Sequence, residues 1–406
     1  MNSDQYEKKK VVLGVAGSIA AYKAVELARL LITRGCEVRV ILTQSASEFV
    51  SALTFEAITH NKVCTDFWES PTSDSIEHIE LADWADVIVV APATADVMAK
   101  MVSGNADTPL TATILASKSP VLLAPAMNVN MWENIATQTN VETLKSRGVR
   151  FVAPEDGELA CGWYGSGRLA DLKEIFYETR RCLSPQDFAG QRVVISAGPT
   201  REAIDPVRFL SNRSSGKMGL ALATEAYRRG AEVVLVHGPI EVELPAAIKC
   251  VEVVSASEMY AAVLEHSFES EKAADIVVMS AAVADYRPKK VSETKIKKRQ
   301  GISSIELEQN VDILAALGAK KAKQAKPFLV GFAVETGEIE HLIEQVQIKL
   351  EEKNADLIIG NFAEEAFELD TNRVWLLDRF GRQDQISTNF KSRIADRILD
   401  EIHKRL

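Results

Sequence analysis

Residues 196–219 read Ser-Ala-Gly-Pro-Thr-Arg-Glu-Ala-Ile-Asp-Pro-Val-Arg-Phe-Leu-Ser-Asn-Arg-Ser-Ser-Gly-Lys-Met-Gly. The apolar run before them, residues 193–195, predicts a buried parallel strand, and residues 220–230 predict a helix that ends at a glycine. A polar segment between such elements lies where open α/β sheets bind ligands, outside the carboxyl ends of the strands. Its glycines, serines, arginines and lysine offer backbone N–H groups and cations to a phosphate. An ordinary surface loop is the alternative, which we disfavour because long loops in compact domains usually have a function.

The composition is that of a globular protein with two or three domains: 406 residues, 47% apolar and 26% charged. A net charge of −10 disfavours non-specific binding to nucleic acid. The five cysteines are odd in number and never spaced Cys-x-x-Cys, which argues against a disulfide framework or a zinc site and for a reducing compartment. Residues 1–10 lack the apolar core of a signal peptide, and no apolar run is long enough to span a membrane. We therefore expect a cytoplasmic protein with no membrane or nucleic-acid partner.

The first half has the pattern of alternating strands and helices that is typical of an α/β domain. Five apolar runs predict strands at residues 11–15, 37–42, 86–91, 120–124 and 148–152, and residues 19–33 form an amphipathic helix pattern. Gly14-x-x-Gly17 after the first strand is not Gly-x-Gly-x-x-Gly, so the dinucleotide fingerprint is absent and only a phosphate-accepting turn remains. Residues 157–167 are rich in glycine and carry Cys161, Trp163 and Tyr164, which suggests a mobile flap more than a packed element.

Residues 184–191 have the composition of a linker, and we place the domain boundary there, with domains at 1–188 and 189–406. Strands are expected at residues 192–195, 232–236, 275–279, 328–331 and 356–359, with an extra strand at 374–378. Helices are expected at 217–229, 256–267, 311–323, 339–353 and 390–404. The fold class is therefore α/β, with two Rossmann-like domains. Residues 285–301 hold seven lysines and arginines, either a solvated face or a loop that holds a triphosphate.

Eight motifs follow one another in order at residues 17–23, 78–81, 91–96, 125–128, 160–162, 197–219, 281–286 and 353–356. They read Gly-Ser-Ile-Ala-Ala-Tyr-Lys, His-Ile-Glu-Leu, Ala-Pro-Ala-Thr-Ala-Asp, Pro-Ala-Met-Asn, Ala-Cys-Gly, the long polar segment, Ala-Ala-Val-Ala-Asp-Tyr and Lys-Asn-Ala-Asp. Each is weak alone, but together they closely resemble the bacterial bifunctional phosphopantothenoylcysteine decarboxylase / phosphopantothenate–cysteine ligase family of coenzyme A biosynthesis. The resemblance covers residues 10–400.

For the first domain, the resemblance implies a flavodoxin-like flavoprotein that binds FMN and decarboxylates 4′-phospho-N-pantothenoylcysteine. Loss of CO₂ needs an electron sink, so in this family the thiol is first oxidised to a thioaldehyde, and the enethiolate left after decarboxylation is protonated and reduced. His78 matches the histidine that assists oxidation and decarboxylation, Asn128 the asparagine that binds the substrate carboxylate, and Cys161 the flap cysteine that protonates the enethiolate. Taken alone, His78 would be interpreted as a surface histidine, and Asn128 could be only a helix cap. A lone cysteine is more often a small buried hydrophobe, but the glycine-rich flap favours a functional Cys161.

The resemblance also implies the cofactor contacts and the assembly. FMN is expected to contact Gly17, Ser18, Ile19, Thr43, Pro92, Ala93, Thr94, Ala126 and Met127. In this family the flavin lies at a subunit contact of a trimer, trimers form a dodecamer, and the ligase domain forms dimers, so we expect a homo-oligomer.

For the second domain, the resemblance implies that 4′-phosphopantothenate is joined to cysteine at the expense of CTP, through an acyl-cytidylate. A carboxylate must be activated before an amine attacks it, and Mg²⁺ balances the charge of the triphosphate. Asn212 matches the residue that stabilises the acyl-cytidylate, Arg208 a neighbour implicated in that half-reaction, and Lys295 a lysine needed to form or convert the intermediate. The positions that match the CTP site are Asp285, Lys295, Asn310, Val311, Asp312, Ile313, Phe332, Lys349 and Lys353.

Three points stay open in the ligase domain. Lys349 and Lys353 are four residues apart and share a helix face, but a solvated face has the same spacing. Val311 replaces a proline that is usual in this family, which puts the rigidity of that loop in question. No metal ligands are assigned, although Asp205 and Asp285 are both candidates to face Mg²⁺.

Two other functional classes fit the sequence less well than the bifunctional enzyme does. A regulatory flavoprotein without activity is expected to lack His78 or Cys161, and both are present. A flavin or nicotinamide reductase is disfavoured by the missing dinucleotide fingerprint and by the polar segment at 197–219.

Overall fold

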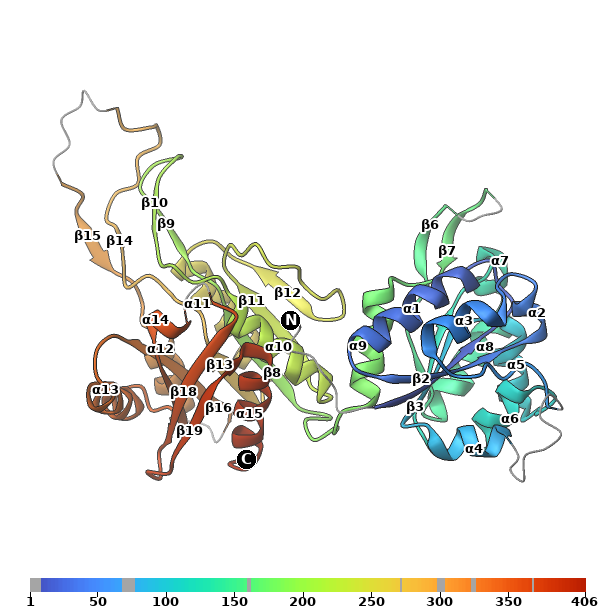
Figure 1. The fold of residues 1–406 in the computed structure, drawn as a ribbon. Coiled ribbons are helices and arrows are strands. Elements are labelled where there is room, and N and C mark those ends of the chain that lie inside the picture. The colour runs from blue at the N-terminus through green and yellow to red at the C-terminus, as the bar shows by residue number, and fades with distance from the viewer. Residues whose placement is uncertain are drawn as a thin grey trace. The chain divides into compact units, whose positions relative to one another are not determined.

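The computed structural model describes residues 9–67, 77–158, 162–270, 272–297, 304–322, 326–366 and 369–406. By its internal contacts the chain divides into two units, Met1–Ser184 and Pro185–Leu406, and each unit has its own main sheet (Figure 1). The expected boundary after residue 188 lies within the first residues of the second unit.

The first unit contains a five-stranded parallel sheet with the order β2-β1-β3-β4-β5, the strand order of flavodoxin-like folds. Its strands are β1 (Lys10–Val15), β2 (Glu37–Leu42), β3 (Val87–Ala93), β4 (Val121–Pro125) and β5 (Arg150–Phe151), with a separate hairpin of β6 (Glu155–Glu158) and β7 (Tyr164–Arg168). Its helices are α1 (Ala21–Thr33), α2 (Gln44–Ser47), α3 (Ala52–Thr59), α4 (Glu77–Trp84), α5 (Ala95–Ser103), α6 (Pro109–Ala116), α7 (Val129–Glu133), α8 (Ile135–Ser146) and α9 (Leu172–Cys182). The five predicted strands of this domain are confirmed, with shifted ends.

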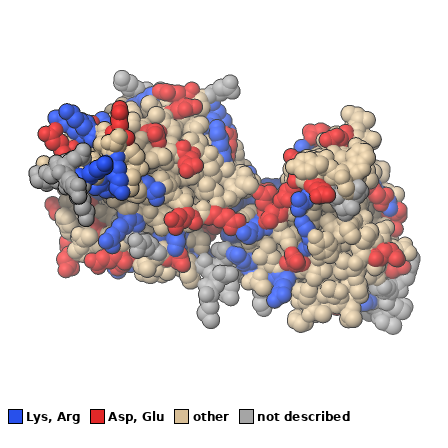
Figure 2. Space-filling model, turned by 90° about the horizontal axis from the view of Figure 1, so that it is seen from above, with Lys and Arg blue, Asp and Glu red and all other residues tan. Residues whose placement is uncertain are grey.

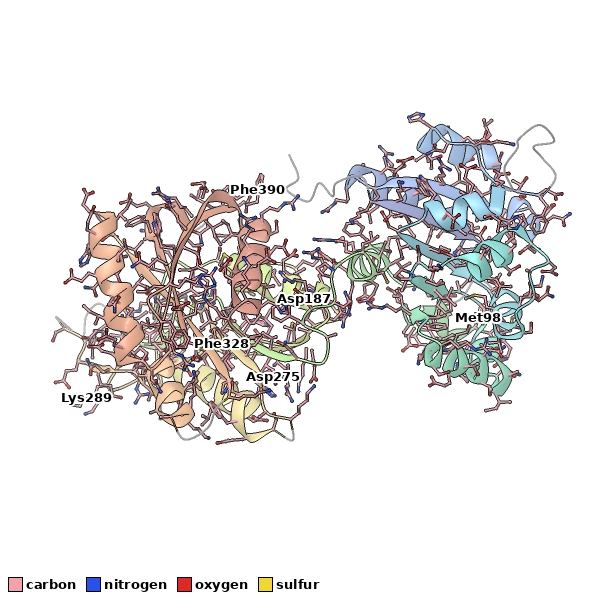
Figure 3. The ribbon with its side chains drawn as sticks, turned by 90° about the horizontal axis from the view of Figure 1, so that it is seen from below. Met98, Asp187, Asp275, Lys289, Phe328 and Phe390 are labelled. Carbon is pink, nitrogen blue, oxygen red and sulfur yellow. The ribbon has the colours of Figure 1, made fainter. Side chains whose placement is uncertain are left out.

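Helices cover both faces of the first sheet because its strands are apolar on both sides. In β1, Val11 and Leu13 pack with α1, α3 and α9, while Val12 packs on the opposite face with α4, α5, α6 and α8. Met98 of α5 is fully buried in that second layer and lies inside the unit (Figure 3). The strand ends are therefore the part of the sheet that helices leave uncovered.

The second unit contains an eight-stranded sheet with the order β12-β11-β8-β13-β16-β17-β18-β19. The first six strands in this order are parallel and follow the Rossmann arrangement, and β18 and β19 add an antiparallel edge. The strands are β8 (Arg192–Ala197), β11 (Glu232–His237), β12 (Lys249–Glu252), β13 (Ile276–Met279), β16 (Phe328–Glu335), β17 (Leu357–Phe362), β18 (Thr371–Asp378) and β19 (Gln383–Phe390). The helices are α10 (Lys217–Arg228), α11 (Ala256–Leu264), a π-helical turn (Glu265–Glu269), α12 (Ile313–Lys321), α13 (Ile339–Glu352), α14 (Ala363–Ala366) and α15 (Lys391–His403).

The chain reverses its strand order between β8 and β13, where open α/β sheets bind their ligands. On one face of the sheet Ile195 packs with α10 and α15, and on the other Val194 packs with α11 and α12. Phe328 opens β16 inside the unit, whereas Lys289 lies at its periphery (Figure 3). The crevice at this switch point is thus flanked by the starts of α10 and α12.

Two segments that were not expected to contain strands form hairpins. The polar segment after β8 contains a hairpin of β9 (Arg201–Ala203) and β10 (Phe209–Ser211), and the flap region contains the β6–β7 hairpin. A further ladder joins β14 (Tyr286–Pro288) to β15 (Leu307–Gln309). These strands are short, and cross-strand hydrogen bonds hold them without an apolar periodicity that a sequence pattern would show.

Candidate active sites

In the first unit, backbone hydrogen bonds link the carboxyl ends of four neighbouring strands. Thr43 N donates to Val15 O (3.0 Å), Ala16 N to Pro92 O (3.2 Å), and Ala126 N to Ala93 O (3.1 Å). The expected flavin contacts that follow β1, β2, β3 and β4 therefore lie along one edge of the sheet. Their convergence follows from the parallel arrangement, because all carboxyl ends of parallel strands meet at one edge.

Three of the expected site residues begin helices at this edge. Thr43 Oγ1 accepts from Ala46 N (3.2 Å), Thr94 Oγ1 from Val97 N (3.3 Å), and Asn128 Oδ1 from Asn130 N (2.9 Å). They are the N-caps of α2, α5 and α7. The helix-cap interpretation of Asn128 is thus correct as a structural role, and it places the amide next to Met127.

The β6–β7 hairpin is packed against the same edge. Met127 N donates to Gly167 O (3.0 Å), and a Cβ at Gly167 would lie 2.3 Å from Met127 O. A Cβ at Gly165 would lie 2.7 Å from Val129 Cγ2. Gly165 and Gly167 therefore allow the hairpin to pack closely against Met127 and Val129, because a side chain at either position would clash. Cys161, the expected proton donor, lies outside the described residues.

His78 lies in the first turn of α4, where its ring meets Phe67 edge to face at a centroid distance of 5.3 Å. Phe67 comes shortly after Cys64, which bridges Ile41 near the end of β2. The contact therefore places His78 beside the edge that carries Thr43. The residues gathered here fit a flavin: small side chains, hydroxyl caps at helix starts, and a hairpin that borders the edge.

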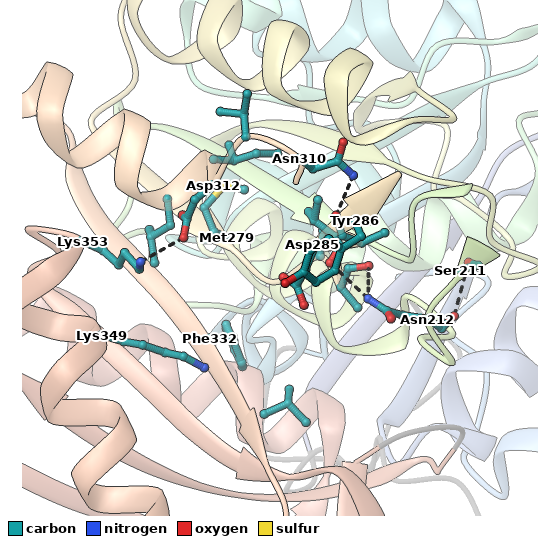
Figure 4. Close-up of a pocket in the computed structure, with 18 of the residues that line it drawn as sticks. Ser211, Asn212, Met279, Asp285, Tyr286, Asn310, Asp312, Phe332, Lys349 and Lys353 are labelled. Atoms are coloured by element: carbon teal, nitrogen blue, oxygen red, sulfur yellow. Dashed lines mark hydrogen bonds and ion pairs between the residues drawn. The ribbon is translucent and has the colours of Figure 1, made fainter. Parts of the chain in front are cut away.

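In the second unit, a cavity of about 1020 Å³ opens at the carboxyl ends of β13 and β16 (Figure 4). It is lined by residues from both sides of the switch point: Ser211, Asn212, Arg213, Met279, 281–286, 309–314, Phe332, 334–336, Lys349, Lys353 and Ala363. Asn212 and eight of the expected CTP positions thus line one cavity. Asn212 Nδ2 donates to the carbonyls of Ala282 and Val283, both at 3.1 Å, so β10 is tied to the end of β13.

The two lysines of the cavity are each paired with an acidic side chain. Lys349 Nζ lies 2.9 Å from Glu335 Oε1, and Lys353 Nζ lies 3.0 Å from Asp312 Oδ2. The hydrogen bond with Asp312 raises the pKa of Lys353 above its ordinary value. Both lysines stand across the cavity from Asn212 (Figure 4). Their shared helix face is therefore a cavity wall and not merely a solvated surface.

Asn310 has an orphan acceptor. Its Nδ2 donates to Ala284 O (2.8 Å) and its backbone N–H to Asp285 O (2.8 Å). Its Oδ1 is buried and has no hydrogen-bond partner among the described residues. A buried acceptor in a cavity wall is suited to a donor from a ligand.

A smaller cavity of about 80 Å³ adjoins the start of α10 and was not anticipated as a separate feature. It is lined by residues 214–218, 280–282, Phe332, Val334, Asn361, Ala366, Asn372 and Lys391. Lys391 is buried and donates to the carbonyls of Ala366 (2.7 Å) and Leu369 (2.6 Å). Two signals in the sequence point to this cavity: the polar segment 196–219, which supplies residues 214–218, and Asn361, a polar residue in the otherwise apolar strand β17. Nothing in the local sequence marks Lys391.

Arg208 and Lys295 do not line either cavity. The Arg208 guanidinium binds Asp205 Oδ2 (2.6 Å) and Ile296 O (2.7 Å), so Arg208 on the β9–β10 hairpin lies near the segment after β14 that carries Lys295. Asp205 is buried by the same contacts and also lies outside the cavity wall. In the described part of the chain, no three His, Cys, Asp or Glu residues form a metal-binding group. Asp285 is thus the one of the two candidate magnesium ligands that faces the large cavity.

Lys and Arg side chains gather over β14 and the segment after it, although the protein is acidic overall (Figure 2). Arg287 pairs with Glu308 (2.7 Å) and Lys289 with Glu306 (3.7 Å) across the β14–β15 ladder. No helix among the described residues is long and apolar enough to cross a membrane.

Comparison with known proteins gives two family matches. Residues 1–184 match the model described as "Flavoprotein", and residues 188–406 match "DNA/pantothenate metabolism flavoprotein C-terminal domain". The chain is 44% identical over 401 residues to the coenzyme A biosynthesis bifunctional protein CoaBC of Bacillus subtilis, which covers 97% of this chain and 96% of that protein. It is 41% identical to the corresponding protein of Vibrio cholerae, with 98% of both chains covered.

Two solved structures resemble the separate halves. The C-terminal domain of a CoaBC protein is 41% identical, covers 54% of this chain and 97% of its own, and has a TM-score of 0.46. A PPC decarboxylase mutant complexed with pantothenoylaminoethenethiol is 34% identical, covers 43% of this chain and 97% of its own, and has a TM-score of 0.39.

Proposed function

Because the chain belongs to the family of bifunctional coenzyme A biosynthesis proteins, we propose that its two units carry two successive reactions at the sites described above. The second unit joins 4′-phosphopantothenate to cysteine with CTP, and the first unit decarboxylates the product with FMN to give 4′-phosphopantetheine. The observation that carries this proposal is the cavity of about 1020 Å³, in which Asn212 and eight expected nucleotide positions meet.

In the ligase site, three features support a nucleoside triphosphate whose base carries an amino group. Lys349 and Lys353 supply cations at one wall, and they would exchange Glu335 and Asp312 for phosphate oxygens. The start of α10 presents backbone N–H groups and Lys217 to the adjoining small cavity, which suits further phosphate oxygens. The orphan Oδ1 of Asn310 would accept from the amino group of the base.

Mg²⁺ fits this site as a partner of the triphosphate. It usually takes one or two carboxylates, several waters and substrate phosphates, so a cage of protein ligands is not needed. Asp285 in the cavity wall offers such a carboxylate. The activated acyl group would then lie near Asn212, whose amide is held by the carbonyls of Ala282 and Val283.

In the decarboxylase site, bound FMN would supply the redox chemistry that makes loss of CO₂ possible. The chain's own residues then position the substrate: Asn128 would bind its carboxylate, His78 would act on protons during oxidation and decarboxylation, and Cys161 would return a proton to the enethiolate. Gly17, Ser18, Ile19, Thr43, Pro92, Ala93, Thr94, Ala126 and Met127 would contact the cofactor.

We also propose that the protein is a homo-oligomer, with trimers formed by the first unit and dimers by the second. The described residues of the first unit expose large apolar side chains, among them Tyr22 (56%), Leu53 (70%), Ile135 (80%) and Tyr164 (79%). Where such side chains form a contiguous patch, they mark an interaction surface. Light scattering on the purified protein tests this, and a monomer at micromolar concentration contradicts it.

A coupled assay tests the two activities together. The purified protein receives 4′-phosphopantothenate, cysteine, CTP and Mg²⁺, and pyrophosphate and CO₂ are followed. We expect both products from the wild type, and loss of CO₂ alone from His78→Asn. Cys161→Ser should still release CO₂ but form no 4′-phosphopantetheine, because Cys161 acts only after CO₂ has left. Pyrophosphate without CO₂ from the wild type removes the decarboxylase, and neither product from a folded, flavin-containing protein removes both assignments.

A further inference from the structure

Asp205 lies in the turn between β9 and β10, where its carboxylate is closed off from solvent. Its side chain is 0% exposed. Oδ1 accepts from the backbone N–H groups of Val207 (2.8 Å) and Arg208 (2.9 Å), and Oδ2 from Arg208 Nε (3.0 Å) and Nη2 (2.6 Å). The carboxylate therefore fixes both the turn and the guanidinium.

The same carboxylate also contacts the segment of residues 292–297, which lies far away in the sequence. Ile296 N donates to Asp205 Oδ2 (3.2 Å), and Ile296 O accepts from Arg208 Nη2 (2.7 Å). Ser292 N donates to Ile204 O (3.0 Å), a second link between the hairpin and this segment. Lys295 is the neighbour of Ile296, so the backbone that carries it is held from Asp205.

The hairpin and the segment both lead directly to the nucleotide cavity. β10 continues into Asn212 and Arg213, and β14 begins at Tyr286, and all three residues line that cavity. A displacement of the hairpin relative to the segment would therefore change the positions of Arg208 and Lys295 without altering the lysine wall formed by Lys349 and Lys353.

Position 205 requires a carboxylate, because hydrogen-bond donors surround both of its oxygens. All described partners of the Asp205 carboxylate are donors, and an amide in its place would turn an NH₂ group toward some of them. Burial alone would raise the pKa of Asp205, but the N–H donors of Val207, Arg208 and Ile296 outweigh it and hold the pKa well below its usual range.

We propose that Asp205 is a positioning residue of the ligase, which holds Arg208 and the Lys295 segment against the β9–β10 hairpin. The inference rests on the proposed function, in which Arg208 and Lys295 take part in forming or converting the acyl-cytidylate. It also gives Asp205 a role that is separate from magnesium binding, since its oxygens are engaged by protein donors.

The second unit provides a matched control in Asp378, the last residue of β18, whose carboxylate accepts from the turn that leads to β19. Its side chain is 5% exposed, and it accepts from Phe380 N (2.9 Å), Arg382 N (3.0 Å) and Arg405 Nε (2.9 Å). Asp378→Asn therefore removes a buried turn carboxylate with the same kinds of donors, but at a place that lines neither cavity.

The experiment compares Asp205→Asn, Asp378→Asn and the wild type as full-length protein. Pyrophosphate release from CTP gives kcat and the KM for CTP, CO₂ release from supplied 4′-phosphopantothenoylcysteine reports the first unit, and thermal melting reports stability. We expect Asp205→Asn to lower the ligase kcat about 10- to 100-fold because misplaced groups lose orientation. Its KM for CTP should stay within about twofold of the wild type, because the lysine wall is intact. Asp378→Asn should lower the melting temperature and leave both ligase constants unchanged.

The outcomes distinguish a failure of the proposed ligase activity from a failure of the positioning role of Asp205. A wild type that releases no pyrophosphate defeats the proposed ligase itself. Ligation at the wild-type rate by folded Asp205→Asn, or an equal loss in Asp378→Asn, overturns the positioning role. If Asp205→Asn does not fold, Asp205→Ser replaces it, because a serine hydroxyl still accepts from the turn but carries no charge.

Discussion

At the scale of the residue, Lys353 is the cation whose removal should weaken nucleotide binding most selectively. It lines the large cavity and is held by Asp312 at 3.0 Å. Charge-assisted contacts contribute about 1.5–3 kcal/mol, so Lys353→Ala should raise the KM for CTP about 10- to 100-fold and leave CO₂ release from supplied intermediate unchanged.

Lys320→Ala is the control for this prediction. Lys320 also forms an ion pair, with Glu269 at 2.8 Å, but it lies outside both cavities. Steady-state pyrophosphate release should show no change in that variant. An unchanged KM for CTP in Lys353→Ala would contradict the assignment of the lysine wall.

Lys391 makes the stability of the second unit depend on pH. Burial, and then the nearby charge of Lys217, lower the pKa of Lys391 from 10.5 to about 8. Between these two values the unfolded chain binds more protons than the folded one, so the free energy of unfolding rises with pH from about 8 to 10.5 and is unaffected below. Lys391→Met should lack this rise.

The pH prediction is measured as a difference of melting temperatures. Wild type and Lys391→Met are melted at about pH 7.5 and about pH 9.5, where other groups titrate equally in both proteins. The linkage over this pH range is about 2 kcal/mol, so the wild type should gain about 4–8 °C relative to the variant at the higher pH. An equal pH dependence of the two proteins would show that Lys391 stays protonated.

At the residue scale, the sequence places a side chain where topology alone fixes its position. Thr43 follows β2 and Pro92 lies near the end of β3, and parallel strands bring their carboxyl ends to one edge. Arg208 and Lys295 instead sit on hairpin and loop segments, whose direction depends on tertiary contacts such as those of Asp205. No local pattern encodes those contacts, so the sequence could not show that these two residues lie outside the cavity wall.

At the scale of the element, Gly318 sets how closely α12 approaches the end of α13. A Cβ at Gly318 would lie 1.9 Å from Lys353 O and 3.3 Å from Asn354 Cβ. Asn354 adopts a left-handed backbone (φ 47°) and donates from Nδ2 to Gly318 O at 3.0 Å. These contacts therefore fix the packing of α12 against the end of α13, next to Lys353, which lines the cavity.

Gly318→Ala has two opposing effects on the stability of the protein, and a melting experiment shows which is larger. Helix propensity alone would stabilise the protein by about 0.8–1 kcal/mol, whereas overpacking costs about 1–3 kcal/mol. We expect a net loss of stability together with a raised KM for CTP, because Lys353 is displaced. Ala319→Gly, on the exposed side of the same helix, should lose stability without a change in KM; a more stable Gly318→Ala would refute the close contact.

The elements that the sequence did not predict share one physical property. β9, β10, β14 and β15 have three residues each, and β19 is largely exposed. Short or two-sided polar strands carry no period-two apolar signal, because no face of them is buried in a core. The buried parallel strands β8, β13 and β17 instead carry continuous apolar runs, because both of their faces are covered, and each was predicted.

At the scale of the whole molecule, each unit has its own hydrophobic core. The described core residues of the first unit pack on the two faces of its sheet, and those of the second unit pack around β8, β13, β16 and β17. All described residues that line the large cavity belong to the second unit. A fragment of residues 185–406 should therefore fold and ligate by itself.

The start of that fragment decides its stability, because residues 185–188 belong to the second core. Phe188 is fully buried and lies under Arg229 at 5.0 Å and beside His403 at 5.7 Å. Arg229 Nε also binds Asp187 Oδ1 at 3.0 Å.

A fragment of residues 189–406 should be less stable than one of residues 185–406 by about 3–5 kcal/mol, the cost of losing a buried phenylalanine. Phe188→Ala in the longer fragment should reproduce most of that loss in urea titrations. Equal midpoints for both fragments would place the boundary after residue 188, and the linker would then contribute nothing to the ligase core.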